Sequence, residues 1–311
     1  MKIRELIFTF LLLVIGITLI GIIMVLSEFD VLKFIELVQT IPIYMFLFWL
    51  FLGVLEYLLQ VFRFKVISES EKSFIELTLN YNLGHLIAFI SPSRAIGEGL
   101  RVLVFKRYLN MSDSKSISSI AIERVFDLVV LCVALTGVLF IFSDLLVPLF
   151  VFLVVLFMLF FLRSSRIHKF VLMFIPIKSL KELASNYFKE TYTFTRDNVK
   201  TSKVVVLSLF VWIVDFFRFW SILNFLGINV SFILVSGVGA ISYFATIISI
   251  FPGGLAFFEG AGTGSLTLLG FDASLVLSAI FIERIFSYWM FIVTGVIIYL
   301  SKLYFERKEN K

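Results

Sequence analysis

The chain has 311 residues, of which 60% are hydrophobic and 16% carry a charge, and its mean hydropathy is +1.05. Soluble domains carry about 25% charged residues because their surface needs polar cover, so this composition excludes a soluble globular protein. In lipid, every backbone N–H and C=O group must be paired within the protein. The apolar runs here are too long and unbroken for the alternating strands of a barrel. We therefore predict an all-α, polytopic membrane protein.

The net charge of +5 does not indicate a nucleic-acid partner, because membrane proteins concentrate Lys and Arg in their cytoplasmic loops. The single cysteine, Cys132, excludes an internal disulfide. One cysteine and two histidines are also too few for a Cys/His metal site, so we expect no metal and no cofactor.

The first apolar run, 6–26, is long enough to span a bilayer and longer than the core of a signal peptide, so we expect it to stay as a signal anchor. Further segments of spanning length are 43–62, 117–142, 145–162, 204–226 and 275–300. Two other apolar stretches, 74–109 and 231–270, are interrupted by Pro and Gly, which predicts two short helices in each. We interpret both as re-entrant hairpins, which gives six crossings. Full crossing by both stretches also gives an even number and stays open.

The distribution of Lys and Arg predicts the orientation. Basic residues gather in the first residues, in the segments 63–74, 94–115 and 163–203, and in the tail 302–311. The segment 27–40 has only Lys33, and the loops 227–230 and 271–274 have none. This pattern predicts a multi-pass protein of the cell membrane with both termini in the cytoplasm.

The one sizeable polar segment is 163–203, and its part from Ile177 to Lys203 has the pattern of a basic amphipathic helix or loop. We interpret it as a cytoplasmic connector that touches anionic lipid headgroups, with a regulatory role as the alternative.

An internal repeat relates the two halves of the chain. Pro252 lies 160 residues after Pro92 (252 − 92), and the sequence AIERVFD at 121–127 returns as FIERIFS at 281–287 with the same offset. We predict a first membrane repeat at 1–143 and a second at 144–311. Three crossings in each repeat make the second inverted relative to the first, an arrangement found in secondary transporters.

Charged residues at membrane depth are costly and are therefore candidates for function. The three arginines that we expect inside spans are Arg124, Arg218 and Arg284. Arg218 lies three residues after Asp215 on the same helix face, which predicts a structural or coupling pair. For the pairs Glu123/Arg124 and Glu283/Arg284 two interpretations stay open. They are mutually neutralised structural pairs, or the arginines present their planar forks to a phosphate.

The tips of both hairpins carry glycines where a half-helix would begin, and a helix N-terminus attracts anions. Gly253 and Gly254 would let a headgroup approach the backbone, whereas Gly260, Gly262 and Gly264 fit either this role or close helix packing. Arg94 and Arg101 are phosphate contacts or interfacial anchors. Glu98 and Glu259 are groups that titrate during transport or helix caps.

Four motifs together resemble a known family: P-x-R-x-x-G-E-x-x-R with Pro92, Arg94, Gly97, Glu98 and Arg101; E-R-x-x-D with Glu123, Arg124 and Asp127; P-G-G-x-x-x-x-E-G with Pro252, Gly253, Gly254, Glu259 and Gly260; and E-R with Glu283 and Arg284. The set looks like the lysylphosphatidylglycerol synthase transmembrane-region family, or flippase-like domain family. Members with a soluble aminoacyl-transferase domain are thought to flip lysyl-phosphatidylglycerol. The resemblance implies lipid translocation here. We expect no lipid aminoacylation, because the sequence ends at Lys311 without that domain.

The sequence therefore predicts a flippase-like transporter of an anionic phospholipid or a polyprenyl phosphate. Its headgroup would be held by residues of the two hairpins and of the two E-R spans: Arg94, Glu98, Arg101, Glu123, Arg124, Asp127, Gly253, Gly254, Glu259, Gly260, Glu283 and Arg284. No catalytic or nucleotide-binding motif is present, so we do not expect an enzyme. The alternatives are an ion-coupled transporter of a small anion and a membrane enzyme acting on a lipid-linked phosphate. Whether the protein forms oligomers stays open.

Overall fold

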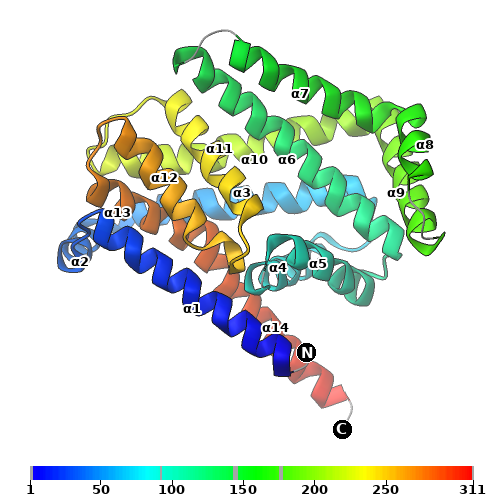
Figure 1. Cartoon of the computed structure of the whole chain (residues 1–311). Coiled ribbons are helices and arrows are strands. Elements are labelled where there is room, and N and C mark those ends of the chain that lie inside the picture. Colours follow the sequence, from blue (N-terminus) through cyan, green and yellow to red (C-terminus); the bar gives the residue numbers. More distant parts are fainter. Residues whose placement is uncertain (1–2, 92, 143–145, 175–177, 310–311) are drawn as a thin grey trace. The chain divides into compact units, whose positions relative to one another are not determined.

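A computed structural model describes residues 3–91, 93–142, 146–174 and 178–309, and within these ranges every regular element is helical (Figure 1). The prediction of an all-α membrane protein is confirmed. The elements are α1 (Ile3–Leu26), α2 (Val31–Thr40), α3 (Ile43–Ser68), α4 (Phe74–Ile90), α5 (Arg94–Leu109), α6 (Asp113–Phe142), α7 (Leu146–Arg163), α8 (Ser165–Met173), α9 (Lys178–Arg196), α10 (Asn198–Phe225), α11 (Phe232–Ile248), the 3-10 turn η1 (Pro252–Gly254), α12 (Phe257–Leu268), α13 (Ala273–Arg284), the π-helix η2 (Ile285–Trp289) and α14 (Met290–Glu309).

The chain divides into two compact units. Unit 1 comprises Met1–Leu55, Tyr81–Arg101 and Val214–Lys311, and unit 2 comprises Glu56–Asn80 and Val102–Ile213. The unit boundaries differ from those of the predicted repeats, since each unit draws on both halves of the chain.

Among the described residues, four helices are long and apolar enough to cross a membrane: Ile43–Ser68, Asp113–Ile141, Asn198–Phe225 and Ala273–Tyr304. The residues from Phe10 to the end of α1 and helix α2 make a fifth candidate that is bent by 88°. Helix α7 also covers the described part of the predicted span 145–162, of which residue 145 lies outside the described residues. Many large apolar side chains lie on the surface, such as Val25, Leu26 and Leu268, which fits a lipid environment and not water. The number of six crossings stays a prediction.

The segment 27–40, which lies between the first two predicted spans, contains helix α2. Its N-cap is Asp30, whose carboxylate accepts hydrogen bonds from the backbone N–H groups of Leu32 and Lys33 at 2.9 and 3.2 Å. Such a cap satisfies donors that the first helical turn leaves free. None of the residues of α2 is buried, so this helix contributes an exposed amphipathic surface.

Both predicted breaks are present as ends of helices. The first separates α4 from α5, and the second separates α11 from α12 through η1 (Figure 1). In the second break, Gly253 and Gly254 have φ of 61° and 71°, which glycine adopts at little cost, and Ala256 has φ of 67°. Whether either broken segment is re-entrant or crosses the membrane stays a prediction.

The last predicted span, 275–300, is one run of helix with a π-helical turn in it. Helix α13 ends at Arg284, η2 covers the next five residues, and α14 continues. Single π turns inside α-helices are rare and occur frequently at functional sites.

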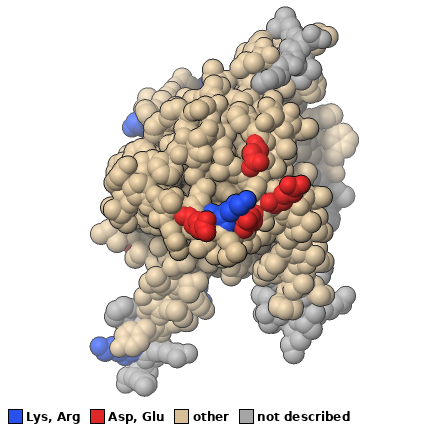
Figure 2. All heavy atoms as spheres, turned by 90° about the vertical axis from the view of Figure 1, so that its left-hand side faces the viewer, with Lys and Arg blue, Asp and Glu red and all other residues tan. Residues whose placement is uncertain are grey.

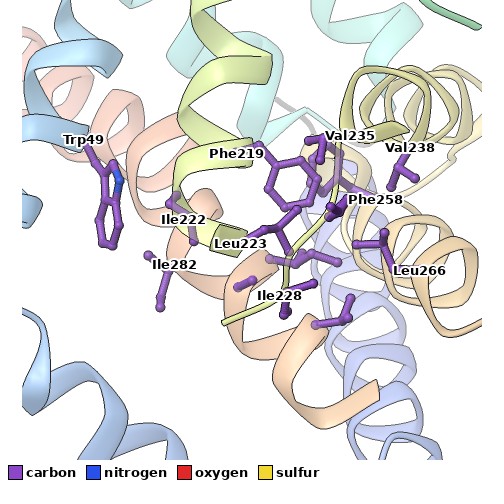
Figure 3. Packing of buried hydrophobic residues seen from close by; sticks show 14 of the residues in the cluster. Trp49, Phe219, Ile222, Leu223, Ile228, Val235, Val238, Phe258, Leu266 and Ile282 are labelled. Carbon is purple, nitrogen blue, oxygen red and sulfur yellow. The ribbon is translucent and has the colours of Figure 1, made fainter. Parts of the chain in front are cut away.

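An apolar cluster holds the helices of unit 1 together (Figure 3). Trp49 from α3 and Phe219, Ile222 and Leu223 from α10 point into it, and Phe258 of α12 packs there as well. The indole Nε1 of Trp49 also donates a hydrogen bond to the Ser221 hydroxyl at 2.9 Å. Phe258, at the start of α12, thus lies in one cluster with residues of α10 and α13, the helices that carry Arg218 and Glu283.

In unit 2, the predicted polar segment 163–203 forms α8 and α9 and the beginning of α10. The imidazole of His168 is buried and stacks on the Phe188 ring, with centroids 4.5 Å apart. Burial lowers the pKa of His168, because it disfavours the charged imidazolium.

The close packing of α4 against α5 predicts a strong effect at Gly97. A Cβ at this position would lie 2.6 Å from the backbone oxygen of Ala88, whereas a Cβ at Gly99 would meet nothing within 4 Å. We expect Gly97→Ala to cost about 1–3 kcal/mol of stability through overpacking. Gly99→Ala, the matched control on the same helix, should be neutral or stabilising by up to about 1 kcal/mol. Unfolding in mixed micelles measures the stability of both variants. Equal stabilities would contradict the close contact between α4 and α5.

Candidate functional site

Arg284 and Glu259 form a buried ion pair at the tip of the second hairpin. The guanidinium Nε donates to Glu259 Oε1 at 2.8 Å, and Nη2 donates to the backbone oxygen of Gly253 at 3.1 Å. The guanidinium also lies over two aromatic rings, 4.3 Å from the centroid of Tyr288 and 5.0 Å from that of Phe258. Such cation–π contacts are strongest where water is excluded. The hairpin tip and the end of α13 are therefore joined through one arginine.

Local backbone geometry explains this arrangement. Gly253 lies so close to the ring of Tyr288 that a Cβ at this position would overlap it. Tyr288 belongs to the π-helix that begins directly after Arg284. Helix α12 begins at Phe257 with Glu259 in its first turn, where a carboxylate is favoured by the helix dipole.

One oxygen of the site carries no hydrogen bond among the described residues. Glu259 is 2% exposed, and its Oε2 is buried without a partner. One helical turn further on, the hydroxyl oxygen of Thr263 is also buried without a hydrogen-bond partner among the described residues. Unsatisfied buried carboxylate oxygens are costly, and Oε2 is such an acceptor at this site.

A second buried cluster of unit 1 is centred on Arg218 of α10. Its Nε and Nη2 donate to both carboxylate oxygens of Glu283, with distances of 2.6 to 3.1 Å. Its Nη2 also donates to Asp215 Oδ1 at 2.7 Å, and the hydroxyl of Tyr243 donates to the same oxygen at 3.0 Å. The structure brings Asp215 and Arg218 together, and Glu283 joins them. The structural or coupling role of this pair stays a prediction.

The corresponding cluster of unit 2 is centred on Arg63 of α3. Its Nη2 donates to Glu123 at 3.0 Å, and its Nη1 donates to Asp127 at 2.6 Å. The indole of Trp212 donates to the same Asp127 oxygen at 2.9 Å. Arg124, which is partly exposed and lies three residues before Asp127, donates to the other oxygen of Asp127 at 2.9 Å.

The two clusters contain the same kind of ion pair in the same sequence context. Arg63 stands in the sequence Phe62-Arg63-Phe64, and Arg218 stands in Phe217-Arg218-Phe219. Each of these arginines binds the glutamate of an E-R motif, Glu123 or Glu283. The same contact thus occurs once in each half of the chain. The repeat boundaries and the inverted topology stay predictions.

Two sequence interpretations are wrong. Arg63, counted as a basic residue of a cytoplasmic loop, is 1% exposed because α3 continues to Ser68. Glu283 does not neutralise Arg284, since both of its oxygens are bound to Arg218. The F-R-F repeat was the signal that would have identified Arg63.

The first hairpin carries a smaller site. Arg101 is fully buried and donates to Glu98 at 2.7 Å, and its guanidinium lies 5.0 Å from the ring centroid of Tyr81. This makes Arg101 an internal residue and not an interfacial anchor. The side chain of Arg94 lies outside the described residues.

The glycines of α12 were expected to serve either headgroup approach or close helix packing. A Cβ at Gly262 would lie 2.8 Å from Ile280, and one at Gly260 would lie 3.4 Å from Ile23, which indicates close helix packing. At Gly264 a Cβ would meet nothing within 4 Å.

A cavity of about 550 Å³ opens between the end of α1, α2 and the beginning of α13. Glu28, Asp30, Lys33 and Asp272 are among its lining residues. Figure 2 shows this side of the molecule, with acidic side chains around a basic group. Two of the segments that are poor in Lys and Arg, 27–40 and 271–274, thus meet at one place in unit 1. Within the described ranges, no three His, Cys, Asp or Glu side chains are grouped as a metal site requires.

A family model of the lysylphosphatidylglycerol synthase transmembrane region matches residues 10–295. The chain belongs to this family. Its relatives include a UPF0104 membrane protein of Methanothermobacter thermautotrophicus, which is 25% identical over 240 residues, covering 69% of this chain and 70% of that protein. A UPF0104 membrane protein of Pyrococcus horikoshii is 26% identical over 115 residues, or 37% of this chain and 34% of that protein. No solved structure matches the chain.

In this member of the lysylphosphatidylglycerol synthase transmembrane-region family, the Arg218–Glu283 pair should be strongly coupled. Arg218→Met alone should cost about 3–5 kcal/mol, because it leaves buried carboxylates without their cation. Adding Glu283→Gln should cost less than the sum of the two single changes, by roughly 0.5–3 kcal/mol. Denaturant unfolding in mixed micelles measures this cycle.

The control cycle uses Lys72→Met and Glu76→Gln, a half-exposed pair 2.9 Å apart in which coupling should stay below about 1 kcal/mol. Equal coupling in both cycles would contradict the structural role of the buried pair.

Proposed function

We propose that this protein moves an anionic or phosphate-bearing lipid between the two leaflets of a membrane, and that the headgroup binds at Arg284. The family provides the class of protein, a membrane region related to a lipid synthase. The observation that carries the proposal is the buried guanidinium of Arg284, which belongs to a helix long and apolar enough to cross a membrane and lies at the break between α11 and α12.

The chemistry of this site suits a phosphate. Arginine presents a planar fork of donors that matches two phosphate oxygens, and it stays charged in an apolar environment. The first turn of α12 adds a helix N-terminus, where Ala256 at the N-cap position has no polar side chain to occupy the free N–H groups. Gly253 and Gly254 supply the positive φ that this turn needs, and the space beside them is filled by Tyr288 and Thr246.

The other buried charges have a supporting role in this proposal. Arg218 binds Glu283, the residue next to Arg284, and so fixes the end of α13. In unit 2, Arg63 does the same for Glu123, the residue next to Arg124. Arg124 is the partly exposed arginine of that cluster, and we propose it as a headgroup contact of unit 2.

Translocation of fluorescent lipids in proteoliposomes tests this function. Wild-type protein should move labelled phosphatidylglycerol faster than labelled phosphatidylcholine. Arg284→Ala should slow the anionic lipid about 10- to 100-fold, since a hydrogen bond to a charged group contributes about 1.5–3 kcal/mol. Arg284→Lys should be intermediate, because it keeps the charge and loses the fork.

The control variant is Arg196→Ala, which removes an exposed arginine of α9 and should leave transport unchanged. Folded yield is measured for each variant. Wild-type rates in the Arg284→Ala variant would exclude the proposed site. If folded protein moves no tested lipid, the function is a small-anion transporter, an enzyme on a lipid-linked phosphate, or transport of a polyprenyl phosphate.

A further inference from the structure

The buried charges around Arg284 do not balance. Two arginines, Arg218 and Arg284, face three acids, namely Asp215, Glu259 and Glu283, and all five side chains are buried in unit 1. Their contacts form one connected chain, because Tyr243 bonds to Asp215 and packs on Phe258, whose ring lies beside Arg284. With every group ionised, the cluster carries one excess negative charge. An anionic headgroup would add a second, which a low-dielectric site does not tolerate.

Glu259 is the acid that can remove this excess. Both oxygens of Glu283 are bound by Arg218, and Asp215 accepts from Arg218 and Tyr243. Glu259 uses only Oε1, and its buried Oε2 has no hydrogen-bond partner among the described residues. A proton on Oε2 would neutralise the carboxyl group and make it a hydrogen-bond donor.

The titratable groups that face Glu259 are few. Helix α13 supplies Arg284 at 2.8 Å, η2 supplies Tyr288, and α11 supplies Tyr243, whose hydroxyl is bonded to Asp215. Neither η1 nor the rest of α12 has a titratable side chain. Helix α1 meets α12 at Ile23, whereas its charged residues, Arg4 and Glu5, lie near its beginning.

We propose that Glu259 binds one proton at Oε2 when an anionic headgroup binds Arg284, and that it releases this proton when the headgroup leaves. The inference rests on the proposed function and adds a coupling ion to it. The proton comes from the aqueous phase on the side where the headgroup enters. The protonated Oε2 then donates to a phosphate oxygen, while the guanidinium donates to the same group. One proton thus crosses with each anionic lipid, and the binding site keeps its net charge.

Calorimetric titration of the full-length protein in detergent tests this coupling. The probe is dihexanoyl-phosphatidylglycerol, a soluble phosphodiester that does not itself change protonation near neutral pH. Titrations at one pH in buffers of different ionisation enthalpy give the number of protons taken up on binding. We expect about one proton per probe for the wild type and none for Glu259→Gln, which should still bind. Glu36→Gln, which removes an exposed acid of α2, should keep the wild-type value.

Binding by the wild type without proton uptake overturns the inference and leaves the proposed function intact. Uptake of one proton by both the wild type and Glu259→Gln also overturns it, because another group would then carry the proton. Failure of folded wild-type protein to bind the probe overturns the inference, and the translocation assay then decides the function separately. If Glu259→Gln does not fold, the wild-type proton number alone decides.

Discussion

A charge inside a membrane protein must be matched by an opposite charge at hydrogen-bond distance, and this constraint determines how helices are joined within each of the two units. In unit 2, Arg63 joins α3 to α6 through Glu123, across 60 residues of sequence. In unit 1, Arg218 joins α10 to α13 through Glu283, across 65 residues. Breaking such a pair leaves an unmatched charge in an apolar environment, which makes each pair a fixed point of its unit.

These pairs explain why Glu283 and the adjacent Arg284 have different partners. Glu283 is bound by Arg218, so the adjacent Arg284 is not neutralised by its own neighbour and reaches the hairpin tip instead. The π-helical turn begins directly after Arg284 and carries Tyr288, whose ring packs against Gly253 and lies under the guanidinium. The Arg218–Glu283 pair therefore leaves Arg284 to contact the glycine-containing turn η1, which is a suitable arrangement for ligand binding.

Much of the architecture could be predicted from hydropathy and from Pro and Gly, because a long apolar run has few choices other than a helix. The breaks near Pro92 and Pro252 and the pair Asp215/Arg218 were visible in sequence as local patterns. The partners of Glu123 and Glu283 were not, since they lie 60 and 65 residues away and only the packing of helices brings them together. Arg63 was missed because the charge density of its neighbourhood resembled a loop, whereas α3 continues beyond the apolar run.

The most direct test of this account is an electron cryomicroscopy structure of the protein in nanodiscs that contain phosphatidylglycerol. The account predicts density for a headgroup phosphate within hydrogen-bond distance of the Arg284 guanidinium, and loss of this density in Arg284→Ala. A structure of transport-active protein in which Arg284 stays enclosed by Glu259, Tyr288 and Phe258, with ordered lipid phosphates bound elsewhere in the membrane region, would contradict it.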